Sequence, residues 1–112
     1  MAYPIQQLYA DLICQVFPEQ PLKAINVGLC ESGLGRHPDT FRLDALHGGP
    51  FQIAYRWQPD GPGIDGWGEF FLANYGWTWE QVVTDPTIHV AAARVIYDRS
   101  GSWAPWPVCG KS

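Results

Sequence analysis

The chain has 112 residues, which fits one domain and leaves little room for a second core, so we expect a single domain over residues 1–112. Hydrophobic residues make up 46% of the sequence and charged residues 16%, which excludes a disordered composition. Seven basic against eleven acidic residues give a net charge of -4 without any lysine or arginine run, so neither a nucleic-acid partner nor a membrane surface is predicted.

The first predicted helix begins at Pro4 and ends before Pro18. Apolar residues recur in this segment at spacings of three and four, and proline suits the first position of a helix. Cys14 lies opposite the apolar stripe. The segment has no basic start and no continuous apolar run, so it predicts neither a signal peptide nor a membrane span.

A second helix is predicted over residues 21–31, where Gly33 and Gly35 break the pattern. Most of its circumference is apolar, so we expect it to be central. Glu31 lies on one apolar side, near the negative end of the helix dipole, and both conditions raise the pKa of a carboxyl group. A general acid needs a shift in that direction. The apolar positions form two sides, Leu22, Ile25 and Leu29 on one and Ala24 and Val27 on the other.

Alternation of apolar and polar residues over 40–55 predicts a short β-hairpin. We expect one strand at residues 41–45, a turn at residues 47–50 and a second strand at residues 51–55. Two prolines and two glycines in residues 58–63 predict a loop that edges a groove.

Three further helices are predicted in the second half of the chain. One carries Trp67 and Phe71 as core residues and stops at Gly76. A short one follows the capping box of Thr78 and Gln81. The last one begins at residues 85–86 and ends near residue 101, and the tail over residues 103–109 packs back across the domain. The expected fold class is therefore α+β and mainly α.

Three cysteines leave one thiol over if a disulfide forms. We expect Cys30 to pair with Cys109, which closes a loop of 109 minus 30, or 79, residues and is worth about 4 kcal/mol in the chain-entropy model. Three free thiols in a reducing compartment are the alternative.

The histidines predict no metal site, because they are scattered and no CxxC or HExxH spacing occurs. Histidines placed in this way are usually structural or exposed. No phosphate-binding glycine loop is present either, because the glycines after residue 31 follow a helix rather than a strand. We expect no cofactor. The histidines are His37, His47 and His89.

Four motifs follow one another in the order that a known superfamily shows. They are Cys30-Glu31-Ser32-Gly33, then Gly49-Pro50-Phe51-Gln52-Ile53, then Asp85-Pro86 with Ala91-Ala92-Ala93, Ile96-Tyr97 and Gly101, and finally Trp103, Trp106 and Cys109. Together they resemble lysozyme-like domains of the soluble lytic transglycosylase and resuscitation-promoting-factor kind, as found in phage or bacterial muramidases, over roughly residues 20–109.

The resemblance implies a mainly α fold with a small β-hairpin beside a saccharide groove. It also implies an enzyme that acts on the peptidoglycan glycan strand and cleaves the β-1,4 bond between N-acetylmuramic acid and N-acetylglucosamine, with Glu31 as the catalytic acid. We expect the protein to be a monomer. Without a signal peptide, the chain would reach the cell wall by lysis, on a virus particle or within a longer exported protein. The alternative is a catalytically inactive wall-binding or virion structural module of the same fold. A weaker alternative is an inhibitor that binds through the tryptophan-rich tail.

Substrate contacts are implied for Gln52, which matches a position that contacts substrate in relatives, and for Tyr97, which matches a tyrosine near the acid. Tyr55, Trp57 and Trp103 lie near predicted loops, where aromatic faces can stack on sugar rings. Relatives usually carry asparagine where this chain has His89, and serine or glycine where it has His47-Gly48, and either departure can change the groove.

A second carboxylate is required if water attacks the glycosidic bond. It is not required if the muramic acid's own groups do so, in which case the product is an anhydro sugar. Asp44 is preferred for this role because it lies in the predicted hairpin, and the other candidates are Asp39, Asp60 and Asp65.

Overall fold

A computed structural model describes residues 4–55 and 66–111 of the chain. Two helices, α1 (Pro4–Val16) and α2 (Pro21–Ser32), precede a sheet formed by β1 (His47–Gly48) and β2 (Ile53–Ala54). Three further helices follow, α3 (Trp67–Tyr75), α4 (Trp79–Thr84) and α5 (Pro86–Ser100), and the chain closes with a 3-10 turn, η1 (Cys109–Lys111). The protein is thus mainly helical with a small two-stranded antiparallel sheet, as its sequence predicts.

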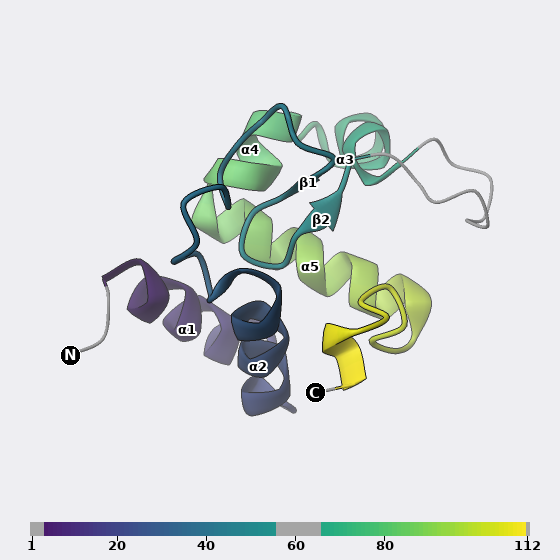
Figure 1. The fold of residues 1–112 in the computed structure, drawn as a ribbon. Helices are drawn as coiled ribbons and strands as arrows, with labels where there is room; N and C mark the ends of the chain where they lie inside the picture. The colour runs from purple at the N-terminus through teal and green to yellow at the C-terminus, as the bar shows by residue number, and fades with distance from the viewer. Residues whose placement is uncertain (1–3, 56–65, 112) are drawn as a thin grey trace.

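The long helix α5 is the centre of the arrangement, packed against α1 and α4 (Figure 1). Helix α2 lies beside α1 and receives η1 from the C-terminal segment. The sheet contacts α3 through β2. Across the two described ranges, no helix has the length and apolar character needed to cross a bilayer.

The helix boundaries follow local signals in the sequence. Thr78 and Gln81 form the predicted capping box, in which each side chain bonds the other residue's backbone N–H. The Asp85 carboxylate accepts from the Ile88 N–H across 3.0 Å and starts α5. Helices α2, α3 and α5 end at Gly33, Gly76 and Gly101, all left-handed.

One of the two apolar sides of α2 is largely exposed. Leu22 is 74% exposed and Leu29 43%, so the helix is less enclosed than its apolar circumference predicts. The helix turns its smaller residues inward because it lies close to α1 and η1, and its buried positions are Ala24, Val27, Gly28 and Ser32. Trp67 and Phe71 do lie in the core, together with Tyr9, Ile13 and Phe17.

The hairpin is shorter than predicted and its turn comes two residues later. Residues 41–45 form no strand, and β1 and β2 pair His47 with Ala54 and Gly48 with Ile53. The Thr40 carbonyl accepts from the Gly49 N–H across 2.8 Å, which curls the preceding segment instead of extending it. Gln52 therefore lies at the end of the turn, at a φ of 50°, rather than on the strand.

Candidate active site

The end of α2 places Glu31 beside a tight reversal of the chain. Gly33, Leu34 and Gly35 adopt φ angles of 64°, 57° and 91°, so three successive residues are left-handed. Leu34 tolerates this conformation because its side chain is buried in the core. The reversal returns the chain to the helix end, where the His37 N–H donates to the Ser32 carbonyl across 3.0 Å.

Glu31 lines two pockets that share three residues, and we call the pair the Glu31 cleft. The smaller pocket has a volume of about 170 Å³ and the larger one about 400 Å³. The shared residues are Glu31, Ser32 and His37; the smaller pocket adds Asp39, Thr40 and Gln52, and the larger one adds Cys30, Gly33, Arg36 and Pro38.

Burial raises the pKa of the Glu31 carboxyl above its ordinary value of 4.5. The side chain is half-buried, so its charged form loses part of the hydration that stabilises it. Its position in the last turn of α2, at the negative end of the helix dipole, acts in the same direction. Glu31 therefore retains its proton to a higher pH than a solvated glutamate does.

The buried side chain of Ser32 joins the helix end to the hairpin turn. Its hydroxyl donates to the Pro50 carbonyl across 2.8 Å and accepts from the Gly35 N–H across 2.9 Å. Gln52 faces the cleft from the same turn, and its side-chain amide donates to the Gly49 carbonyl across 3.0 Å. The amide oxygen takes no part in that bond. One hydrogen-bonded unit thus fixes the acid and the turn relative to each other.

Asp39, rather than Asp44, lines the cleft with Glu31. Asp44 is exposed and faces Arg42, whose guanidinium nitrogens lie 3.0 and 2.8 Å from the two carboxylate oxygens. This bond with Arg42 lowers the pKa of Asp44, which is therefore a paired surface anion. The placement does not support the preference for Asp44. Asp60 and Asp65 lie outside the described residues.

The predicted aromatic contacts are dispersed. The Tyr55 ring packs edge-on against Trp79, with ring centroids 5.0 Å apart. Tyr97 and Trp103 pack against each other at 4.8 Å and against Phe17, and neither lines the Glu31 cleft. Of the predicted substrate contacts that the structure describes, only Gln52 reaches the cleft. Trp57 lies outside the described residues.

His89 is fully buried beneath the hairpin turn. Its Nδ1–H donates to the Val82 carbonyl across 2.8 Å, and its Nε2 accepts from the Phe51 N–H across 2.9 Å. Burial lowers the pKa of this imidazole to about 4, so the ring is neutral at pH 7. A side chain at Gly49 would begin 2.2 Å from the ring, which explains the glycine there. His89 thus supports the turn that carries Gln52.

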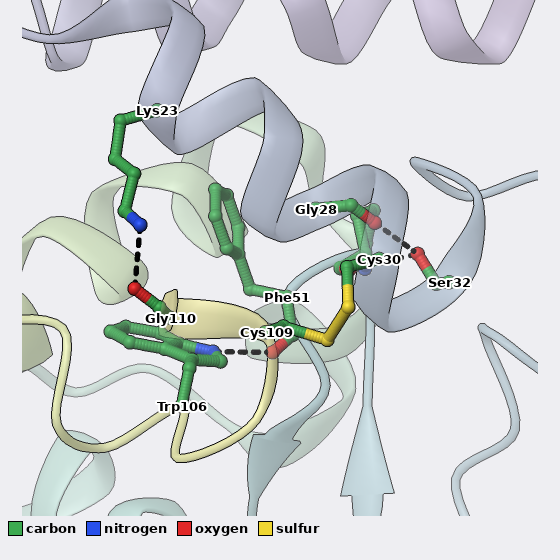
Figure 2. Close-up of a disulfide and its surroundings, with 9 residues drawn as sticks. Lys23, Gly28, Cys30, Ser32, Phe51, Trp106, Cys109 and Gly110 are labelled. Atoms are coloured by element: carbon green, nitrogen blue, oxygen red, sulfur yellow. Dashed lines mark hydrogen bonds between the residues drawn. A yellow bond between two sulfur atoms is a disulfide. The ribbon is translucent and has the colours of Figure 1, made fainter. Parts of the chain in front are cut away.

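A disulfide joins Cys30 to Cys109 with an S–S distance of 2.07 Å, which confirms the predicted pairing, and Cys14 is an exposed free thiol. Figure 2 shows the tail held beside α2 by further bonds around this disulfide. The Trp106 indole N–H donates to the Phe51 carbonyl across 2.7 Å. The tail is therefore tied both to the residue before Glu31 and to the hairpin turn.

Several residues of the cleft carried no signal in the sequence. His37 was one of three scattered histidines, and Arg36 and Thr40 belonged to no motif. Only the glycines at 33 and 35 indicated a reversal that would return these residues to Glu31. Within the described residues, no group of three His, Cys, Asp or Glu side chains is placed to hold a metal ion.

Comparison with protein families, curated proteins and solved structures finds no match to this chain. The site is therefore interpreted from its own geometry and chemistry.

Proposed function

We propose that the protein is a lysozyme-like domain that cleaves the glycan strand of peptidoglycan, with Glu31 as the general acid. The observation that carries the proposal is a half-buried carboxyl group of raised pKa that lines a cleft. The resemblance to lytic transglycosylases and resuscitation-promoting factors supports it, because the first two of the four motifs meet at this cleft and Cys109 of the last motif is bonded to Cys30 beside it.

Cleavage of a glycosidic bond requires that a proton be delivered to the bridging oxygen, which becomes the leaving group. The Glu31 carboxyl donates its proton to the bridging oxygen, the bond from that oxygen to the anomeric carbon breaks, and positive charge develops on the sugar. The resulting Glu31 carboxylate then lies next to this charge and can take a proton from the attacking group. The acid must be un-ionised at the start, which its environment favours.

The attacking group distinguishes the two classes of enzyme. In a hydrolase, Asp39 is the candidate second carboxylate because it lines the same pocket as Glu31. In a lytic transglycosylase, the muramic acid's own hydroxyl attacks and no second carboxylate is needed. A second carboxylate in the cleft is what hydrolysis would require.

The polar rim of the cleft suits a sugar chain. Gln52 offers an amide oxygen, Arg36 is a donor in the larger pocket, and the combined cavities reach the size of known ligand sites. The protein carries a net charge of -4, so attraction to an anionic wall has to come from such local contacts.

Digestion of purified peptidoglycan, followed by mass spectrometry of the products, tests the proposal. Wild-type protein should release muropeptides with reducing ends, and Glu31→Gln should release them at least a hundredfold more slowly. Glu80→Gln is the matched control because Glu80 is exposed on α4. Equal release by Glu31→Gln and wild type, or binding without fragments, contradicts the proposal; the second result favours an inactive wall-binding module.

A further inference from the structure

His37 lies in both parts of the Glu31 cleft and takes no part in the acid chemistry proposed above. It lines the smaller pocket and the larger one, as Glu31 and Ser32 do. Its backbone is held on both sides. The His37 N–H donates to the Ser32 carbonyl across 3.0 Å, and the His37 carbonyl accepts from the N–H and the hydroxyl of Thr40 across 3.1 and 2.6 Å. His37 is therefore fixed relative to the last turn of α2, next to the acid.

The imidazole ring of His37 is oriented by the backbone of Asp39. The Asp39 N–H donates to His37 Nδ1 across 3.3 Å, and only a ring nitrogen without a hydrogen can accept such a bond. The neutral ring therefore carries its hydrogen on Nε2. Within residues 4–55 and 66–111 the ring makes no hydrogen bond besides the one at Nδ1, so the Nε2–H is available to a ligand in the cleft.

A neutral donor suits the neighbourhood of Glu31. A positive charge in the smaller pocket would favour the carboxylate and lower the pKa of Glu31, against the effect of burial. A neutral ring N–H provides a directed hydrogen bond without that charge. Gln52 supplies the opposite polarity in the same pocket, because its amide nitrogen is bonded to the Gly49 carbonyl and its amide oxygen can accept. The smaller pocket thus combines an acid, a neutral donor and an acceptor.

We propose that His37 is a substrate-binding residue of the Glu31 cleft, in which the Nε2–H donates to an oxygen of the sugar at the bond that breaks. The inference rests on the proposed function, because its ligand is the glycan strand assigned to this cleft. The alternative is a purely structural histidine, whose ring serves only to accept the Asp39 N–H at Nδ1. The two roles use different ring nitrogens, and substitution can therefore separate them.

Two substitutions distinguish the nitrogens. An asparagine amide reaches about as far as Nδ1, so His37→Asn can still accept the Asp39 N–H but lacks the outer donor; a glutamine amide reaches about as far as Nε2, so His37→Gln keeps that donor. NMR titration with a soluble N-acetylglucosamine tetramer measures the affinities in the Glu31→Gln background, in which the probe is not consumed. We expect His37→Asn to weaken binding about fivefold and His37→Gln to stay within about twofold of the parent.

His47→Asn is the matched control for the loss of an imidazole. His47 is exposed on β1 and lines neither pocket of the cleft, so this variant should bind the tetramer as the parent does. The midpoint of denaturant unfolding, measured for each variant, separates a loss of affinity from a loss of fold.

The ring nitrogens give a second readout, which a structural role would not move. At about pH 8, where a free imidazole is neutral, long-range proton–nitrogen NMR spectra should show the hydrogen of His37 on Nε2. The hydrogen of His89 should be on Nδ1, as its bond to the Val82 carbonyl requires. Addition of the tetramer should shift the His37 Nε2 resonance and leave the ring resonances of His47 and His89 in place.

Three results overturn the inference: equal affinity of His37→Asn and the parent, equal losses in His37→Asn and His37→Gln, or an Nε2 resonance that the tetramer does not move. The resonance is measured on the parent, so it decides the question even if a variant fails to fold. Fragment release by the wild-type protein reports separately on Glu31. Fragments without a shift of Nε2 retain the enzymatic function and reject the role of His37, whereas a shift without fragments retains the His37 contact in a wall-binding module.

Discussion

The Ser32 hydroxyl donates a hydrogen bond to the Pro50 carbonyl across 2.8 Å and so joins the helix that carries Glu31 to the turn that carries Gln52. The same oxygen accepts from the Gly35 N–H, which anchors the reversal that brings His37 and Asp39 to the cleft. A single buried side chain therefore connects three parts of the site. In the Glu31-Ser32 pair, the serine has a positioning role beside the acid.

Replacement of Ser32 by alanine should destabilise the protein by about 2–3 kcal/mol, because the Pro50 carbonyl and the Gly35 N–H lose a buried partner. Denaturant unfolding measures this loss. Ser100→Ala, at an exposed position, should change the free energy of unfolding by less than about 0.5 kcal/mol. An unchanged midpoint for Ser32→Ala would show that the bond contributes nothing.

Stability should fall in acid because of His89. Its pKa is about 4 in the folded protein and 6.5 when unfolded, so above pH 6.5 the ring is neutral in both states. Between pH 6.5 and 4 the unfolded chain binds a proton that the folded protein excludes, and the free energy of unfolding decreases by about 3 kcal/mol. His89→Asn should abolish this part of the pH dependence. Parallel stability curves for the two proteins between pH 4 and 6.5 would contradict the burial of a neutral imidazole.

Reduction of the disulfide should cost about 4 kcal/mol of stability, since it closes a loop of 79 residues. The measurement is denaturant unfolding with and without reductant. Alkylation followed by mass spectrometry should label one thiol before reduction and three after it. Cys14→Ser should label none before reduction and lose little stability, because Cys14 is exposed. Three reactive thiols in the unreduced protein would exclude the pairing.

The sequence predicts those parts of the fold that depend on local signals. Capping residues such as Thr78 and Asp85 act on backbone groups of their own helix, so the predicted starts of α4 and α5 agree with the structure. Which face of α2 is buried depends on α1 and η1, and a periodic pattern with two apolar sides cannot choose between Leu29 and Val27. The shortened hairpin likewise depends on a distant residue, His89.

The residues of the candidate site also fall into two groups, those that the sequence identifies and those that only the fold brings together. Glu31 is identifiable because an acid at the end of an apolar helix is unusual in its own right. The aspartates are equivalent in sequence, and only the left-handed reversal at residues 33–35 brings Asp39 rather than Asp44 to the cleft. Tyr97 and Trp103 belong to an aromatic cluster around Phe17, which a motif position does not reveal.

If the proposed hydrolysis uses Asp39 as the base for the attacking water, replacement of Asp39 by asparagine should slow release of reducing-end muropeptides by about a hundredfold or more. Asp44→Asn is the matched control and should leave the rate within about twofold, since Asp44 pairs with Arg42 at the surface. Product analysis by mass spectrometry measures both. Anhydro products released at the wild-type rate by Asp39→Asn would instead indicate transglycosylation.

Titration of the Glu31 side-chain carbon by NMR, with Glu31→Gln used to assign the signal, measures whether this carboxyl group keeps its proton above the usual pH range. We expect the carboxyl to titrate above 4.5, the ordinary pKa of a glutamate, because burial disfavours its charged form. The rate of wall cleavage should fall as the pH rises through the same midpoint. A midpoint at or below 4.5 would show a solvated carboxylate at position 31 and would contradict its role as the acid.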